Sequence, residues 1–215
     1  MLYKKLEGIV LKQTNYREAD RIVTIWTKEE GRIRVLAKSV RLSKSKLSYS
    51  LQDLSYIQFE TSGKRLSIII NVKLIRNFQH LRENLKTATL GIFLKELMLK
   101  VTVDSQPNHD VYQLFLSALN YLNSSNEKLN IFEAGLSFAI KLLKFQGFYQ
   151  SENLKKTLGR ADQSVLLILK DLETQEFSSL KLLSPEKYKA IERYVKNILE
   201  YIIEREIKSL DYLPR

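Results

Sequence analysis

The sequence predicts an α+β protein in which a small barrel of strands precedes a bundle of helices. Between residues 5 and 77 the apolar residues recur mostly at every second position, which is typical of strands. From about residue 79 onward their spacing becomes helical. Since 215 residues suffice for two small domains, each with its own core, we expect a barrel domain over 1–78 and an all-helical domain over 79–215.

Five strands are expected, near 5–13, 18–28, 31–38, 54–61 and 65–77. The third alternates between a core face and a cationic face, which carry Ile33, Val35 and Ala37 against Arg32, Arg34 and Lys38. The core faces of the fourth and fifth strands should hold Ile57 and Phe59, and then Leu66, Ile68, Ile70, Val72 and Leu74. Five strands in about 75 residues favour an OB-fold barrel, with an SH3-like barrel as the nearest alternative.

The helical part has recognisable helix starts. Capping residues mark three of them: Asn108, a capping box at Asn130 and Glu133, and Ser184 followed by Pro185. Residues 131–147 are apolar nearly all round, with Lys141 and Lys144 as exceptions. That helix should therefore lie at the centre of the bundle.

The residue types that common enzyme chemistry needs are missing. The chain has no cysteine and two histidines, which excludes disulfides, thiolate catalysis and cysteine-ligated zinc, and argues against a histidine metal site. It has neither a P-loop nor a G-x-G-x-x-G motif. We expect a protein that is not an enzyme and that needs no cofactor or metal.

The sequence contains neither an apolar run of the roughly 20 residues that a membrane-spanning helix needs nor a secretory signal. A cytoplasmic protein is therefore expected. Its net charge is +11, and residues 1–75 hold 15 Lys and Arg against 7 Asp and Glu, whereas residues 76–215 hold 20 against 17. The first third should face a polyanion. Nucleic acid is favoured over a membrane surface because this part lacks a basic amphipathic helix.

The strongest local feature is a cationic stretch without one acidic residue, comprising Arg32, Arg34, Lys38, Arg41, Lys44 and Lys46. Phosphate binding uses cations spread along a groove together with short donors, and serines are interspersed here. The alternative is a solvated basic loop. Because the stretch continues a strand with a cationic face, we expect phosphate contacts, with Lys12, Arg17 and Arg21 as a second tier. Tyr16 and Tyr49 are the candidates for stacking on bases.

Several segments, taken in order, resemble the RecO family of bacterial recombination mediators. Residues 7–12 are similar to its opening strand, and residues 16–22 to its Y-x-E-x-D-R-I element. Residues 31–38, followed by Arg41 and Lys44, resemble its G-x-x-x-x-x-A-K-G-x-R stretch. Near the other end, residues 146–149 and 207–213 resemble its leucine-glycine-tyrosine turn and its terminal L-x-S-x-x-x-L.

The resemblance implies an OB-fold that binds single- and double-stranded DNA and a helical domain that docks other repair proteins. It further implies a nucleoid-associated protein that anneals complementary strands and, with RecR, helps RecA replace the single-strand-binding protein SSB. The acidic tail of SSB is then an expected ligand of the helical domain. Its candidate contacts are Lys141, Lys144, Lys155, Lys156 and Arg160.

This chain departs from the family pattern at two informative places. Many members carry a four-cysteine zinc site after the leucine-glycine-tyrosine turn, but residues 151–157 contain no cysteine, so no zinc is expected. Ser39 stands where glycine is usual, which should affect the backbone at the start of the basic loop.

Two other functions fit the same residues. An OB-fold protein that binds RNA would use the same cations and aromatic side chains. An adaptor would act mainly through its helical domain, with the basic loop binding an acidic peptide.

Overall fold

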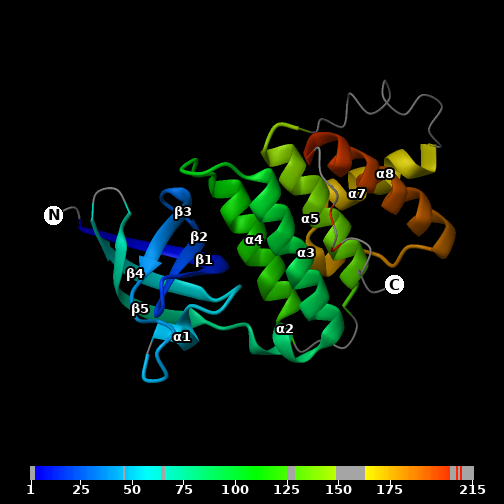
Figure 1. Ribbon diagram of the computed structural model, residues 1–215. Coiled ribbons are helices and arrows are strands. Elements are labelled where there is room, and N and C mark those ends of the chain that lie inside the picture. Colours follow the sequence, from blue (N-terminus) through cyan, green and yellow to red (C-terminus); the bar gives the residue numbers. More distant parts are fainter. Residues whose placement is uncertain are drawn as a thin grey trace. The chain divides into compact units, whose positions relative to one another are not determined.

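The computed structural model describes residues 3–45, 47–63, 66–124, 129–148, 163–203, 207 and 209. The chain divides into two compact units (Figure 1). The barrel unit comprises Met1–Phe78 together with Thr102–Tyr112, and the helical unit comprises Gln79–Val101 together with Gln113–Arg215. A short segment from the middle of the chain therefore belongs to the barrel unit.

The barrel consists of β1 (Tyr3–Tyr16), β2 (Asp20–Thr27), β3 (Gly31–Ala37), β4 (Tyr56–Ser62) and β5 (Ile68–Arg76). The strands close in the order β1-β2-β3-β5-β4, and β4 pairs back on β1. All pairs are antiparallel except β3 with β5, which meet in parallel at Leu36 and Ile68. The short helix α1 (Leu47–Ser50) lies between β3 and β4 in the chain. The predicted fold class, an OB-fold barrel followed by helices, is confirmed, with strand ends shifted by up to three residues.

The barrel core is built from the inward faces of all five strands. Its fully buried members include Val10, Val23, Ile25, Val35, Ala37, Ile57 and Phe59, and Ile33 packs against them. Burying one such large side chain contributes roughly 1.5–3 kcal/mol. The predicted core faces of the third and fourth strands are thus confirmed.

On β5 the predicted core face is partly wrong. Val72 and Leu74 pack against the core as expected, but Ile69 is buried and Ile70 is 52% exposed. The reason is a bulge in β5 itself: the consecutive residues Glu60 and Thr61 of β4 pair with Asn71 and Ile69, which leaves Ile70 as an extra residue. Such a bulge moves the side chains that follow it to the other face of the sheet.

The helices are α2 (Gln79–Glu83), α3 (Leu85–Val101), α4 (His109–Leu122), α5 (Ile131–Phe145), α7 (Gln163–Thr174), the 3-10 turn η2 (Phe177–Ser179) and α8 (Pro185–Ile203). Helix α5 contacts α3, α7 and α8, and its ring at Phe138 packs against Phe115 of α4 at 6.0 Å between centroids. Eleven of its residues are buried. The prediction of a central helix is confirmed.

All three predicted helix starts are confirmed, because α4, α5 and α8 begin at His109, Ile131 and Pro185. The Asn108 side chain accepts a hydrogen bond from the Val111 amide at 3.1 Å, and α8 begins at Pro185. Asn130 is the N-cap of α5 as predicted, but its side chain makes no capping hydrogen bond, so the bonding of the predicted capping box is wrong. Their side chains instead bind the chain that returns past this helix end: Asn130 donates to the carbonyl of Leu180, and Glu133 accepts from the amide of Leu183.

Candidate nucleic-acid interface

The turn between β1 and β2 is held against the loop that follows β3. The Arg41 amide donates to the Ala19 carbonyl at 3.0 Å, and its guanidinium Nη1 donates to the Glu18 carbonyl at 2.8 Å. These bonds bring residues 16–21 and 38–45 together at one end of the barrel, and we call the two stretches the rim. The loop between the first two strands is one of the usual ligand contacts of an OB-fold.

Two lysines are the most available cations of the rim. Lys38 and Lys44 are exposed, and neither forms an ion pair or hydrogen bond with any residue that the structure describes. A lysine ammonium is a compact charge on a flexible stem, so both can reach a phosphate without breaking an existing contact. Lys46, the last cation of the predicted stretch, lies outside the described residues.

The three arginines of the rim already contact other groups of the barrel. Arg41 is exposed but uses one guanidinium nitrogen on backbone carbonyls. Arg21 is half-buried and donates to the Gln13 side chain at 2.7 Å. The exposed Arg17 places its guanidinium 5.3 Å from the centroid of the Tyr16 ring. These side chains keep donors for a phosphate, but the Tyr16 ring already has a cation over one face.

The two arginines of β3, Arg32 and Arg34, instead form ion pairs with a carboxylate. Asp104, from the segment Thr102–Tyr112 of the same unit, accepts from Arg32 Nε at 2.5 Å and from Arg34 Nη2 at 2.8 Å. Partial burial by itself would raise the pKa of the Asp104 carboxyl, but the two arginines hold this pKa below its usual value. The carboxylate is therefore charged at neutral pH and offsets half of the charge of the arginine pair.

The role of Asp104 was not apparent from the sequence, because this residue lies 72 and 70 residues along the chain from its two partners. No periodic pattern links an acidic residue in a loop to a strand so distant. The only available signal was the position of Asp104 just before the 106–110 break between helices, which said nothing about its partner.

The remaining barrel candidates lie apart from the rim arginines. Lys12 is exposed on β1, directly opposite Thr24 of β2. Tyr49 of α1 is 55% exposed, and its hydroxyl accepts a hydrogen bond from the Asn77 side chain at 2.7 Å. Its ring is thus oriented while remaining available for stacking.

A buried polar cluster joins the barrel to the segment Thr102–Tyr112. The Tyr56 and Tyr112 hydroxyls both donate to Oε1 of Glu7, the latter at 3.0 Å. Burial, the neighbouring Tyr56 and the Glu7 carboxylate together raise the pKa of Tyr112 far above its ordinary value. The cluster therefore holds this segment in place independently of Asp104.

Family models match both parts of the chain. The model described as Recombination protein O N terminal covers residues 1–78, and that described as Recombination protein O C terminal covers residues 82–153. The chain belongs to the RecO family.

Curated members of the RecO family agree with this assignment. The DNA repair protein RecO of Acetivibrio thermocellus is 35% identical over 150 residues, which are 69% of this chain and 59% of that protein. The one from Listeria monocytogenes is 31% identical over 147 residues, 68% of this chain and 56% of that protein. These alignments span less than two thirds of the relatives' length. A match to the protein of Desulforamulus reducens, 24% identical, covers 98% of this chain and 94% of that protein.

The backbone at Ser39 shows how this RecO-family chain manages without the usual glycine. Ser39 has a φ of +54°, in the left-handed region where glycine is favoured. Its amide donates to the Asp20 carboxylate at 2.8 Å, across the rim. The conformation is thus kept, at a strain of about 1 kcal/mol, by a bond between the two rim stretches.

Two of the candidates for partner binding, Lys141 and Lys144, already contact other residues of the helical unit. Lys141 donates to the Gln175 carbonyl, lies 4.9 Å from the centroid of the Phe177 ring, and has a pKa lowered by burial. Lys144 forms an ion pair of 2.5 Å with the nearly buried Glu173. The other three candidates, Lys155, Lys156 and Arg160, lie outside the described residues, as does the stretch 151–157.

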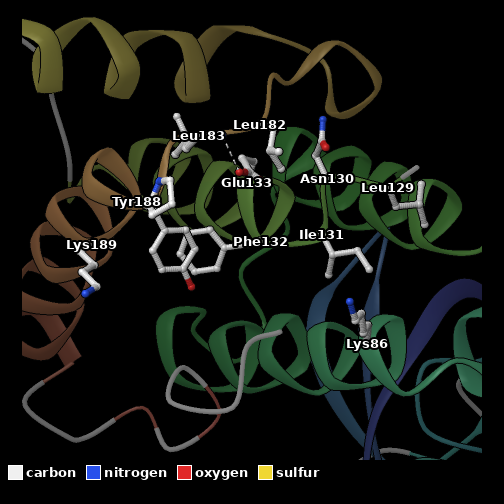
Figure 2. A pocket seen from close by; sticks show the side chains of 11 residues that line it. Lys86, Leu129, Asn130, Ile131, Phe132, Glu133, Leu182, Leu183, Tyr188 and Lys189 are labelled. Atoms are coloured by element: carbon white, nitrogen blue, oxygen red, sulfur yellow. Dashed lines mark hydrogen bonds between the residues drawn. The ribbon is translucent and has the colours of Figure 1, made fainter. Parts of the chain in front are cut away.

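The helical unit also contains an apolar pocket that the sequence did not indicate (Figure 2). Its volume is about 460 Å³, and it lies between the starts of α5 and α8. The rings of Phe132 and Tyr188 form one wall, with their centroids 3.7 Å apart, and the two cations Lys86 and Lys189 come from α3 and α8. Glu133 also lines the pocket, but its carboxylate accepts the Leu183 amide.

Neither a cluster of metal ligands nor a membrane-spanning helix occurs among the residues that the structure describes. In those parts of the chain, no three His, Cys, Asp or Glu side chains are grouped so that they could hold a metal ion. No helix there has both the length and the apolar character needed to cross a membrane.

Proposed function

We propose that this RecO-family chain binds single- and double-stranded DNA through its barrel unit and anneals complementary strands in recombinational repair. With RecR, it would help load RecA onto DNA covered by SSB, in the cytoplasm and near the nucleoid. Membership of a family of DNA repair proteins supports a role in repair. The observation that carries the proposal is the rim, where exposed cations that have no acidic partner among the described residues gather on an OB-fold.

The chemistry of the rim suits annealing. Lysines and arginines bind phosphates in any sequence, and most of the affinity comes from the release of counterions. A protein that holds the backbone in this way leaves base edges free to pair. Lys38, Lys44 and Arg41 are the principal proposed phosphate contacts, with Arg17, Arg21, Lys12 and Lys46 as further contacts. Tyr49 and, less accessibly, Tyr16 would stack on bases.

The test is a titration of labelled single-stranded DNA with the full chain, followed by fluorescence anisotropy at several salt concentrations. Lys38→Gln/Lys44→Gln should reduce the slope of log affinity against log salt by about 1.4, or about 0.7 for each lost contact. The matched control is Lys5→Gln/Lys73→Gln, which removes two exposed lysines of β1 and β5 outside the rim. Equal losses in both variants would refute the rim as the binding site.

The same titration separates DNA from RNA. Matched DNA and RNA oligonucleotides are made to compete for the wild-type chain. Preference for DNA supports the repair function, and clear preference for RNA would favour the alternative of an RNA-binding OB-fold protein.

A second function, docking of a protein partner, is favoured by the pocket in the helical unit. An apolar hollow with Lys86 and Lys189 on its walls suits a peptide that carries an apolar side chain and carboxylates, as an acidic tail of SSB would. Because Lys141 and Lys144 already have internal partners, this pocket is the better docking site. Lys86→Gln/Lys189→Gln should weaken binding of a labelled SSB-tail peptide, whereas Lys5→Gln/Lys170→Gln should not.

A further inference from the structure

The segment Thr102–Tyr112 is attached to the first half of β3, away from the described pair between β3 and β5. Strand β3 pairs with β5 only at Leu36. Farther back along β3, the Ser105 amide donates to the Arg32 carbonyl at 2.9 Å. At Gly31 the two backbones approach so closely that a Cβ would lie 2.3 Å from the Gln106 carbonyl oxygen. The segment thus continues the pairing where β5 ends it.

The Asp104 side chain also contacts β3. It does so on the face that OB-folds use to bind nucleic acids, which is formed largely by β2 and β3. Its two oxygens each bind one guanidinium, Oδ1 that of Arg32 and Oδ2 that of Arg34. Two oxygens of a phosphate would make the same contacts with the same donors. The carboxylate therefore occupies the position that a DNA phosphate would take.

The attachment of the segment does not depend on this carboxylate. The Tyr112 hydroxyl, the Ser105 amide and the close contact at Gly31 hold the segment by other means. The Asp104 side chain is 41% exposed, so solvent weakens its contribution to stability. The Asp104 carboxylate does, however, directly neutralise part of the positive charge of the two arginines.

We propose that Asp104 withholds Arg32 and Arg34 from DNA and so confines phosphate binding to the rim. This inference rests on the proposed DNA-binding function. It assigns to Asp104 the role of a residue that limits both the size of the site and its affinity. Removing the charge of Asp104 should extend the site from the rim onto the face of β3.

The experiment compares Asp104→Asn with Asp110→Asn in the anisotropy titration. Both substitutions remove one negative charge from the same segment, and Asp110 is exposed at the start of α4. Asp104→Asn should bind single-stranded DNA more tightly than the wild type and steepen the salt slope by about 0.7, chiefly through Arg34, whose side chain is 63% exposed against 16% for Arg32. Asp110→Asn should behave like the wild type. Equal slopes for the two variants would overturn the proposal.

A double variant identifies the source of the gain. In Arg34→Gln/Asp104→Asn most of the added slope should disappear, because the more exposed of the two arginines is gone. An undiminished gain would mean a general effect of charge and would also overturn the proposal. Asp104→Asn could melt at a lower temperature than the wild type. In that case Asp104→Ser, which also lacks the charge, is titrated in its place, and its salt slope is compared with that of Asp110→Asn.

The wild-type titration keeps this inference distinct from the proposed function. If the wild type binds DNA and the Asp104 variant gains nothing, only the role of Asp104 fails. If the wild type does not bind DNA even at low salt, the proposed function itself fails.

Discussion

The rim lysines Lys38 and Lys44 and the cationic face of β3 come from one stretch of the chain without an acidic residue, yet they differ in their partners. On β3, Arg32 and Arg34 share the carboxylate of Asp104. In the rim, Lys38 and Lys44 are exposed and have no ionic partner among the described residues. The difference teaches that a run of cations in a sequence marks a region, whereas the tertiary partners of each cation decide which of them can bind a ligand.

The largest effect is expected where the segment Thr102–Tyr112 meets β3. Gly31→Ala should destabilise the protein by roughly 3 kcal/mol, because the residue has a φ of +68° and a Cβ there would collide with the Gln106 carbonyl. The melting temperature followed by circular dichroism measures this. Gly147→Ala is the control, since its φ is also positive, at +77°, but no atom lies within 4 Å of the added Cβ. Similar losses in both variants would contradict the close contact between segment and strand.

A smaller effect is expected from the buried cluster that holds the same segment. Tyr112→Phe should cost about 1–2 kcal/mol at neutral pH, because the Glu7 carboxylate loses a donor. The pKa of Tyr112 is raised in the folded state, so the stabilisation is complete below the unfolded value of about 10 and is lost as the pH rises above it.

Urea unfolding at pH 7 and above pH 10 checks this prediction. The difference between wild type and Tyr112→Phe should shrink at the higher pH. A constant difference for Tyr112→Phe would mean that its hydroxyl does not titrate with unfolding.

The smallest effect is expected in the rim itself. Ser39→Gly should stabilise the protein by about 0.5 kcal/mol, because relief of the left-handed backbone outweighs the greater freedom of the unfolded chain. Ser43→Gly, an exposed position of the same loop, is the control and should be neutral or destabilising. Urea unfolding distinguishes the two. A loss of stability in Ser39→Gly would show that the serine side chain contributes more than the strain costs.

Much of the fold could be predicted from the sequence because local patterns determine it. The alternation on β3 and β4 predicted the correct core faces. The apolar residues on nearly all sides of α5 predicted its central position. The error on β5 arose from a bulge at Ile70 of that strand, which interrupts the two-residue alternation and becomes visible only in the pairing with β4. The capping box at Asn130 failed because the chain near Leu180 supplies other partners for the same side chains.

The site was less predictable than the fold, because it depends on contacts between residues that are far apart in the sequence. The sequence identified the cations of the rim, and local alternation placed Arg32 and Arg34 on the outer face of their strand. It did not reveal the carboxylate of Asp104, because that contact depends on how a loop some 70 residues away returns to the barrel. The pocket beside Tyr188 likewise combines residues from separate helices.

The central claim, that the rim and not the whole cationic stretch binds DNA, is tested most directly by comparing two pairs of substitutions. Lys38→Gln/Lys44→Gln and Arg32→Gln/Arg34→Gln each remove two positive charges, and the salt dependence of single-stranded DNA binding is measured for both. The account predicts a slope reduced by about 1.4 for the rim pair and a much smaller change for the β3 pair. A larger loss from the β3 pair than from the rim pair would contradict it.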